Sequence, residues 1–324
     1  MQGITELMKE KAAKLLSDGT VNRVLAWEAG EFSYDQSPAV FTDVKDLDKM
    51  VYGCFSAPNL SKYLINETKK DGKILAFLKP CDTLSFNQLI VEHRVEREKV
   101  YIVGIECHGK ADIEKIRKYA KGVVSAEENN KTILVHTLYG DVELEKKDVL
   151  LEKCLACKGK KHRIYDELIV VNEMEEQNYD RFGKVAELEK MTPDERFAFF
   201  KNELSKCIRC NACRNVCPAC SCVKCVFDND KSGVKSKANS DSFEEKMFHI
   251  IRAFHVAGRC TDCGECSRVC PQGIPLHLLN RKFISDINNF YGEYQAGEDI
   301  SKKCPLTDFT KGDIEPEDAK RRNR

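Results

Sequence analysis

Apolar and polar residues follow two different periods along the first half of the chain. Amphipathic segments with helical spacing are interleaved with short apolar runs of strand length. The segments that carry this pattern are MQGITELMKEKAAKLLSDG at the N-terminus, KILAFLK (73–79), KVYIVGIEC (99–107), ADIEKIRKYAKG (111–122), KTILVHTL (131–138) and ELIVV (167–171). Because helices and strands that alternate along a chain are typical of an α/β sheet, we predict an α/β domain over residues 1–180.

The pattern changes near residue 180, and the next clear signal is a helix start. In TPDERFAFFKNELSKC, Thr192 and Glu195 form a capping box and Pro193 occupies the first helical position. The sequence therefore predicts a helix that leads directly into Cys207.

A second helix is predicted between Ser242 and Gly258. Ser242 and Glu245 form another capping box, and glycine is a typical stop signal. Apolar residues at helical spacing support this helix; they are Phe243, Met247, Ile250, Ile251 and Phe254. The helix is expected to end just before Cys260.

These signals divide the chain into three predicted parts. Residues 1–180 form the α/β domain, 181–295 form a helical, ferredoxin-like domain, and 296–324 form a polar tail that contributes to no core. Within the second part, the polar segment NDKSGVKSKANSDS is interpreted as a solvated loop or, alternatively, as a docking segment for a partner.

Composition narrows the class of protein. Lysine and arginine (52) balance aspartate and glutamate (52), which argues against a charge-driven nucleic-acid binder. The N-terminal segment lacks the uninterrupted apolar core of a signal peptide, and the longest apolar runs, such as VYIVGI (100–105), are too short to span a membrane. We expect a soluble, cytoplasmic protein without membrane insertion. In a reducing compartment, 17 cysteines favour metal or redox chemistry over a disulfide framework.

Two cysteine runs share the spacing C-x2-C-x2-C-x3-C followed by proline. This is the spacing of bacterial ferredoxins, in which three cysteines bind one 4Fe-4S cluster and the fourth binds the neighbouring cluster. Short loops let three thiolates converge, while the fourth leaves along the following segment. We assign the first cluster to Cys207, Cys210, Cys213 and Cys270. We assign the second cluster to Cys260, Cys263, Cys266 and Cys217.

Two neighbouring clusters form a relay for single electrons, so this domain is predicted to transfer electrons. Zinc is the alternative, because paired C-x2-C motifs also form four-thiolate zinc sites, although zinc needs neither the third cysteine nor the trailing proline. Three further cysteines, Cys220, Cys222 and Cys225, have two interpretations. They form a further metal site completed by Cys54, Cys304 or a partner, or they are packed thiols.

Four more cysteines form a dispersed set closer to the N-terminus. Cys81 in LKPCD and Cys107 in VGIECHG follow predicted strands, where α/β sheets place their sites, and Cys154 and Cys157 form a C-x2-C pair. Four is the number of thiolates that one cubane cluster needs. Buried thiols at strand ends are the alternative for Cys81 and Cys107.

The order of these motifs resembles a known family, the β subunits of deazaflavin-reducing hydrogenases and formate dehydrogenases, which are iron-sulfur flavoproteins. Its Pro-Cys, Gly-hydrophobic-x-Cys and C-x2-C motifs are similar to Pro80–Cys81, Gly104–Cys107 and Cys154–Cys157. CPACSC and AGRCTDCGECSRVCPQGIPL resemble the dicluster part of formate dehydrogenase β subunits, of anaerobic sulfite reductase A subunits and of sulfhydrogenase β subunits. The resemblance covers roughly residues 20–285.

The resemblance implies a third 4Fe-4S cluster beside a flavin, FAD. The ligands that it implies are Cys81, Cys107, Cys154 and Cys157. Lys79 and Asp82 are implied to contact the flavin phosphate or ribose; the alternative is that they are surface residues at a strand end. The sequence contains no G-x-G-x-x-G dinucleotide motif.

Together these signals predict an electron-transferring iron-sulfur subunit of a multi-subunit anaerobic complex, an oxidoreductase whose partner subunits complete catalysis. The resemblance implies a formate dehydrogenase, a hydrogenase, a heterodisulfide-reductase-like module or a sulfite reductase as the partner. The basic segment KCLACKGKKHR (153–163) is a docking site for an acidic carrier such as ferredoxin, or a solvated face. Two alternatives stay open: a flavin-free relay in a sulfite-reductase or sulfhydrogenase type complex, and a zinc-binding interaction module.

Overall fold

The structure is a computed structural model that describes residues 3–129, 131–159, 161–172, 180–229, 231 and 242–308, with side chains in the last range described from residue 247 onward. Most of the polar segment predicted between the two cysteine runs, the Glu245 side chain of the second predicted capping box, and the tail beyond residue 308 lie outside the described residues.

All described strands precede residue 170, whereas the described chain after residue 180 is helical. The strands are β1 (Arg23–Ala29), β2 (Gln36–Phe41), β3 (Met50–Val51), β4 (Ile74–Leu78), β5 (Val100–Ile105), β6 (Val123–Glu128), β7 (Thr132–Thr137), β8 (Gly140–Glu145) and β9 (Glu167–Ile169). The α-helices are α1 (Ile4–Ser17), α2 (Ser61–Glu67), α3 (Pro80–Val91), α4 (Ile113–Ile116), α5 (Lys146–Val149), α6 (Glu152–Leu155), α7 (Gly183–Lys190), α8 (Pro193–Leu204), α9 (Ala212–Asn215), α10 (Ser242–His255), α11 (Glu265–Arg268) and α12 (His277–Tyr291). Short 3-10 helices are η1 (Val44–Lys49), η2 (Arg97–Lys99) and η3 (Val226–Asp228).

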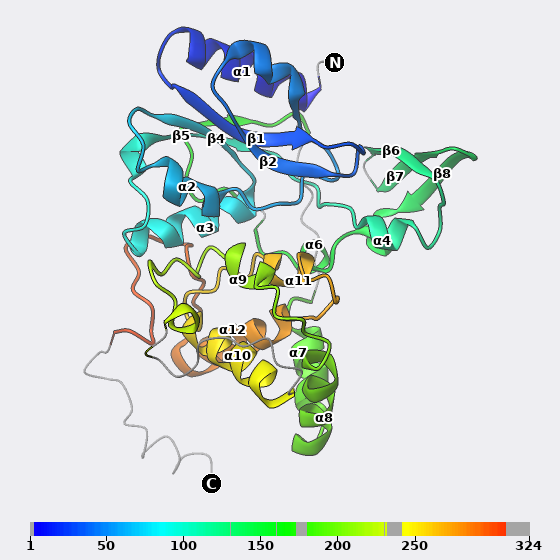
Figure 1. Ribbon diagram of the computed structural model, residues 1–324, viewed down its shortest axis with the longest axis vertical. Coiled ribbons are helices and arrows are strands. Elements are labelled where there is room, and N and C mark those ends of the chain that lie inside the picture. Colours follow the sequence, from blue (N-terminus) through cyan, green and yellow to red (C-terminus); the bar gives the residue numbers. More distant parts are fainter. Residues whose placement is uncertain are drawn as a thin grey trace.

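A six-stranded sheet forms the core of the first half, in the order β2-β1-β4-β5-β9, with β3 also paired to β1. Strands β1, β4, β5 and β9 are parallel, and β2 and β3 run antiparallel to β1. Helix α1 lies on one face of the sheet, and α2 and α3 lie on the other (Figure 1). The central strands are continuous apolar runs because both faces are covered, and every residue of β4 is buried.

The parallel register of β4 and β5 brings two cysteine-bearing segments to one edge of the sheet. Leu78 at the end of β4 is paired with Gly104 near the end of β5. The segments that follow carry Cys81 and Cys107, so they leave the sheet side by side. This edge is where open α/β sheets place their ligands.

A separate antiparallel sheet of three strands, β6-β7-β8, interrupts this α/β order. The sequence pattern placed residues 131–138 in the same rhythm as the main sheet, and the structure corrects this. In β7, buried Ile133 and Val135 alternate with half-buried neighbours, which is typical of an antiparallel sheet with one covered face. Residues 111–122, which carry a helical pattern, contain only the short α4.

The second half packs its helices as pairs, with α10 against α8 and α12, and α7 against α12 (Figure 1). The capping box predicted at the start of α8 is present. Thr192 Oγ1 accepts a hydrogen bond from the Glu195 amide at 3.3 Å, and Glu195 Oε2 accepts one from the Thr192 amide at 2.8 Å. Among the described residues, no helix combines the length and apolar character needed to cross a membrane.

Candidate metal centres

Each of the two cysteine runs folds into the same local structure. The second and fourth residues after the first cysteine have left-handed backbone conformations, with φ of 54° and 61° at Arg209 and Asn211 and of 56° and 64° at Asp262 and Gly264. A four-residue helix follows in each run, α9 and α11, and these helices contact each other. Residues other than glycine rarely adopt positive φ, so their repetition at equivalent positions indicates a backbone shaped by what the thiols must reach.

The last cysteine of the first run lies among the thiols of the second run. Burial raises the pKa values of Cys260, Cys263 and Cys266, the last to about 11, and the neighbouring Cys217 thiol raises each of them further. This is the grouping that the crossed assignment of the second cluster requires. Ligation by these four thiols stays a prediction.

The last cysteine of the second run lies, in turn, with the first run. Burial raises the pKa of the Cys213 thiol, and the nearby thiols of Cys270 and Cys210 raise it as well. Cys210 is exposed and Cys207 is half-buried. The first site therefore lies closer to the protein surface than the second one.

The dispersed cysteines also converge, at the edge of the main sheet. Burial raises the pKa of Cys154 to about 12, and the neighbouring thiols of Cys107 and Cys157 contribute to this rise. Burial, Asp82 and then Cys157 raise the pKa of Cys81 well above its ordinary value. The structure thus brings together the four thiols that the family resemblance groups, although their ligation of a third cluster stays a prediction.

The chemistry of all three thiol groups fits an iron-sulfur cluster. Buried thiols with raised pKa values resist ionisation, because several thiolates that lie close together in a dry site repel one another. Iron ions supply the positive charge that lets such thiols bind as thiolates, so the deprotonation and the binding of metal are linked. Among the described residues, no group of three or more histidine, cysteine, aspartate or glutamate side chains is arranged to hold a single metal ion.

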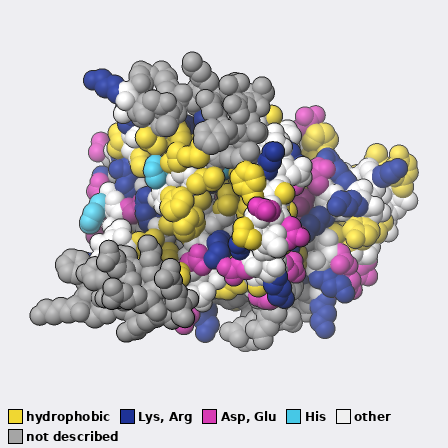
Figure 2. All heavy atoms as spheres, turned by 90° about the horizontal axis from the view of Figure 1, so that it is seen from below, with side chains coloured by type: hydrophobic (Ala, Val, Ile, Leu, Met, Phe, Trp, Pro, Cys, Tyr) yellow, Lys and Arg dark blue, Asp and Glu magenta, His cyan; other side chains and the backbone are white. Residues whose placement is uncertain are grey.

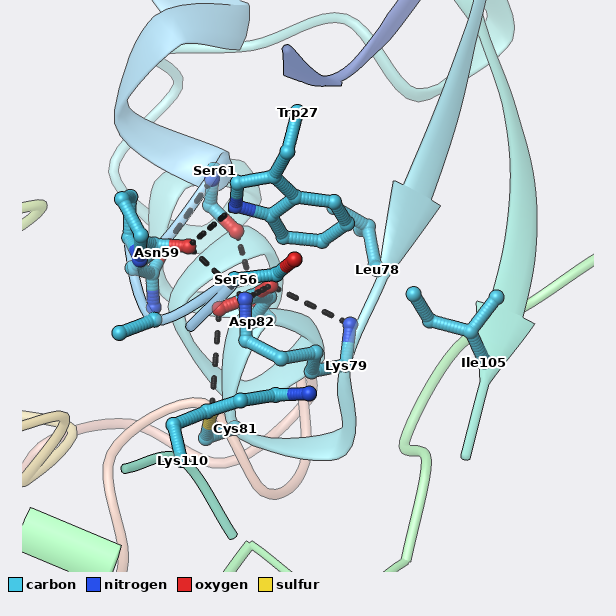
Figure 3. Close-up of polar contacts among 12 residues, drawn as sticks. Trp27, Ser56, Asn59, Ser61, Leu78, Lys79, Cys81, Asp82, Ile105 and Lys110 are labelled. Atoms are coloured by element: carbon cyan, nitrogen blue, oxygen red, sulfur yellow. Dashed lines mark hydrogen bonds and ion pairs between the residues drawn. The ribbon is translucent and has the colours of Figure 1, made fainter. Parts of the chain in front are cut away.

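Lys79 and Asp82 form a buried ion pair beside Cys81 (Figure 3). Their side chains are 1% and 0% exposed, and Lys79 Nζ lies 3.0 Å from Asp82 Oδ2. The ammonium also donates to the Pro58 carbonyl at 2.8 Å and lies 4.0 Å from the centre of the Trp27 ring. The surface alternative for this pair is therefore wrong.

The visible role of this pair is to fix the start of α3. Asp82 Oδ2 accepts a hydrogen bond from the Lys79 amide at 3.2 Å, which closes the first turn of the helix that carries Cys81. The Lys79 ammonium also lowers the pKa of the Cys81 thiol, against the larger effect of burial. Contact between this pair and a flavin stays a prediction.

A buried ion bridge connects the dispersed site to the second cysteine run. Lys153, which precedes Cys154, forms an ion pair with Glu265 of α11 and donates to the Ala57 carbonyl at 2.8 Å. Arg268 binds the same carboxylate through two nitrogens, at 2.9 and 2.7 Å. Glu265 is fully buried, which raises its pKa, yet Lys153 and Arg268 outweigh burial and lower it to about 2.

The backbone of the second run fits closely against this bridge. A Cβ atom at Gly264 would clash with the Lys153 side chain, so glycine allows the two segments to touch. Nearby, the Ser85 and Thr261 hydroxyl groups are hydrogen-bonded at 2.9 Å. The site at Cys154 therefore lies directly beside the site at Cys263 and Cys266.

Helix α10 turns a polar side toward the cysteines. Its apolar residues at helical spacing would normally face a core, but Met247 and Ile250 are each 37% exposed and Phe254 is 61% exposed. Figure 2 shows hydrophobic side chains gathered on this face of the molecule. The buried side carries apolar Phe248 and Ala253, each 2% exposed, and beside them polar His249 and Arg252, which are 2% and 3% exposed.

Both of these buried polar residues approach the first site. His249 Nε2 lies 3.2 Å from the Cys207 sulfur, and Arg252 Nη2 donates to the Cys213 carbonyl at 3.1 Å. Sequence patterns alone did not single out either residue. One sequence feature could have identified them: a histidine and an arginine lie one helical turn apart, in a helix that leads into a cysteine run.

The extra cysteines do not form one group in the described structure. Cys220 lies beside Cys217, and its hydrogen bond to the Cys217 sulfur lowers the pKa of Cys217 to about 5. Cys222 is exposed. Cys54 packs in the core beneath the small sheet, whereas Cys304 packs in a different cluster with Tyr294. Neither interpretation of the extra cysteines is decided by these positions.

A cavity of about 700 Å³ lies between the two halves of the chain. Aromatic side chains of Tyr34, Phe55 and Tyr63 line it, together with the cationic side chains of Lys62 and Arg268. Its wall also includes residues next to the dispersed cysteines and residues of α9. Its size is within the range of small-molecule and cofactor sites.

Comparison with known proteins identifies the helical part first. Residues 203–274, which contain both cysteine runs, match the family described as 4Fe-4S dicluster domain. The F420-dependent formate dehydrogenase subunit beta of Methanocaldococcus jannaschii is 25% identical over an alignment that covers 92% of this chain and 92% of that protein. The F420-dependent formate dehydrogenase 1 subunit beta of Methanococcus maripaludis is 26% identical and covers 75% of this chain and 78% of that protein. Over most of its length, the chain is similar to curated formate dehydrogenase β subunits.

These similarities confirm the family resemblance predicted from the cysteine motifs. In the second half, the chain is also similar to putative ferredoxin-3 of Sinorhizobium fredii, with 35% identity over 82 residues that cover 24% of this chain and 76% of that protein. A ferredoxin-type relative and a dicluster family in the same segment favour 4Fe-4S clusters over zinc for the two runs.

Proposed function

We propose that this chain is the electron-transferring iron-sulfur subunit of a cytoplasmic, multi-subunit anaerobic oxidoreductase of the formate dehydrogenase type, whose partner subunits complete catalysis. The observation that carries the proposal is the buried Lys153–Glu265 bridge. It places the dispersed cysteines directly beside the second cysteine run, whose thiols in turn adjoin the first run. Three candidate 4Fe-4S sites therefore follow one another through the protein, as an electron relay requires.

The described residues support this relay in three ways. They bury at least one thiol of each site and leave most of the others half-buried, which limits the access of water. They place cations near buried thiols, since Lys79 and Lys153 both lower the pKa of Cys81, against the larger effect of burial. They also bring the first site to the surface at Cys210, where single electrons can be exchanged with a partner. The proposed order of sites is dispersed, second and first.

Iron content tests the three sites directly. Anaerobically purified wild-type chain is expected to contain about twelve irons and as many labile sulfides, with no zinc, because each site holds four irons. Cys154→Ser is expected to contain about eight, and Cys222→Ser, which changes an exposed and unassigned thiol, is expected to match the wild type. About eight irons in the wild type would remove the dispersed cluster from the proposal, and zinc without iron would overturn the proposal as a whole.

We further propose that FAD binds in the cavity between the two halves. The aromatic side chains of Tyr34, Phe55 and Tyr63 fit a flat ring system, and the Lys62 ammonium fits a phosphate group, whereas Arg268 is already bound to Glu265. The acidic residues Asp35, Asp112 and Glu114 also line the cavity, so the phosphate is expected on the side of Lys62. When bound, FAD would exchange an electron pair with a two-electron partner and single electrons with the clusters. The chain itself would orient the ring against the dispersed site, whose neighbours Ala111 and Leu151 line the same cavity.

Flavin retention tests this cavity. Tyr63 is 41% exposed and lines the cavity, so Tyr63→Ala should leave the core intact and lower the FAD retained after purification by about two- to tenfold, the value of one aromatic contact. The measurement is the fluorescence of flavin released by acid. Tyr139→Ala, which changes an 82% exposed tyrosine outside this cavity, is the matched control. Wild-type protein without flavin would support the flavin-free relay instead.

The identity of the partner is tested by co-purification. The proposal expects a catalytic subunit of a formate dehydrogenase, a hydrogenase or a heterodisulfide-reductase-like module to co-purify with this chain from its native host under anaerobic conditions. A sulfite-reductase or sulfhydrogenase partner would favour the flavin-free alternative. Recovery of the chain only as a free protein would contradict its assignment as a subunit.

A further inference from the structure

Arg252 is a buried cation that faces both ferredoxin-type sites. Its side chain projects from α10 into the cysteine region and is 3% exposed. Its guanidinium binds the Cys213 carbonyl, in the first site, at 3.1 Å. The thiols that act on it electrostatically include members of both sites. Cys217 and Cys266 belong to the proposed second site, Cys213 belongs to the first, and Cys220 is the unassigned neighbour of Cys217.

Among the described residues, Arg252 has no carboxylate partner that balances its charge. Burial disfavours the charged guanidinium, but the nearby cysteine sulfurs raise its pKa well above the ordinary value. Its Nε donor has no hydrogen-bond partner among the described residues. No ion pair with an acidic group is found for it in the part of the chain that the structure describes. A buried cation without a carboxylate is costly unless other negative charge lies beside it.

We propose that Arg252 raises the reduction potentials of both ferredoxin-type clusters by placing one fixed positive charge between them. This inference rests on the proposed function, because it requires clusters at the two cysteine runs. It goes further by naming one residue that sets how readily both sites accept an electron. Arginine suits this task because it keeps its proton under all working conditions.

The electrostatic argument is symmetrical between the two sites. When one electron leaves the first site and arrives at the second, one negative charge moves from one side of the guanidinium to the other. Arg252 binds or releases no proton in this step. Because the cation stabilises the additional electron at either site, it raises both potentials in the same direction. The dispersed thiols are not among the largest influences on the pKa of Arg252, so the third potential should shift less than the other two.

Arg252→Gln tests this proposal in the full chain. At a fixed potential, the ratio of reduced to oxidised cluster is expected to fall about tenfold for both ferredoxin-type clusters, which corresponds to a decrease of about 59 mV for one electron. The readout is a redox titration followed by electron paramagnetic resonance. Iron content is measured on the same samples, so loss of clusters is distinguished from a shift in potential. Wild-type protein that holds no clusters would overturn the proposed function rather than this inference alone.

Two further variants separate charge from structure. Arg252→Lys keeps the positive charge and is expected to retain potentials near those of the wild type. Arg97→Gln removes an arginine that precedes β5, whereas Cys107 follows the other end of this strand. This variant is expected to change neither potential. Unchanged potentials in an iron-replete Arg252→Gln protein would overturn the inference. If that variant loses iron, Arg252→Lys decides: a tenfold fall in the ratio despite the retained charge would also overturn it.

Discussion

Replacing Glu265 with glutamine is expected to lower the free energy of unfolding by about 3–5 kcal/mol. Glutamine has almost the same shape, so the expected loss comes from charge and not from packing. The Glu265 carboxylate is fully buried and binds both Lys153 and Arg268. Removing one partner of a buried ion pair leaves the other charge uncompensated in a medium that solvates it poorly.

The position of this bridge makes the effect large. Lys153 belongs to the first half of the chain and Glu265 to the second, and the carboxylate also accepts a hydrogen bond from the Asn59 amide at 3.3 Å. The variant therefore weakens the contact between two cysteine sites as well as a local ion pair. The measurement is anaerobic unfolding in denaturant, followed by the fluorescence of Trp27, the only tryptophan, which lies in the core of the main sheet.

A double-mutant cycle provides the control. Lys153→Met alone should also be strongly destabilising, because it leaves Glu265 with one partner fewer. The double variant should lose clearly less stability than the sum of the two single losses, since a buried pair costs more to break than to replace. Glu92→Gln, which changes a less buried carboxylate paired with Arg259, is expected to cost less than Glu265→Gln. Additive losses in the cycle would contradict a direct ion pair between the two residues.

The elements with a strong local signal were predictable from the sequence. The runs at β4 and β5 are buried on both faces, so their apolar character is continuous and their strand length is clear. The capping box at Thr192 depends only on residues within one turn, and α8 begins where it predicts. The small sheet was not separated from the main one, because β7 has strand character whichever sheet it joins. Pairing with its neighbours in the chain, β6 and β8, decides that choice, and the period of β7 alone does not encode it.

The grouping of the cysteines was easier to predict from the sequence than the side chains that surround them. Cysteine spacing reports ligand geometry locally, and this is why the two runs were recognised before the fold was known. The groups around them come from distant segments. Lys153 meets Glu265 across 112 positions of sequence, and His249 meets Cys207 across 42. No local period encodes such meetings. At α10 the apolar pattern was only a partial guide to orientation, because polar His249 and Arg252 are buried toward the cysteine sites together with Phe248.

The crossed arrangement of the two runs gives the sharpest test of the proposed sites. Cys217→Ser changes a residue of the first run, yet it is expected to disrupt the second cluster, because Cys217 lies among Cys260, Cys263 and Cys266. The iron content should fall from about twelve to about eight if the whole cluster is lost. The measurement combines iron analysis with electron paramagnetic resonance of the reduced protein, in which one of the ferredoxin-type signals should disappear.

Cys270→Ser is the reciprocal variant, and the comparison of the two identifies which cluster each one removes. Its serine lies with Cys213 and Cys210, so it should disrupt the first cluster although it belongs to the second run. Cys220→Ser is the closest control, because Cys220 lies beside Cys217 but is assigned to no cluster. This variant should retain about twelve irons. Redox titration distinguishes the remaining signal in each variant, since the clusters differ in burial. If Cys217→Ser and Cys270→Ser left the same cluster intact, the two runs would not exchange their last thiols. This result would overturn the crossed assignment of the two clusters.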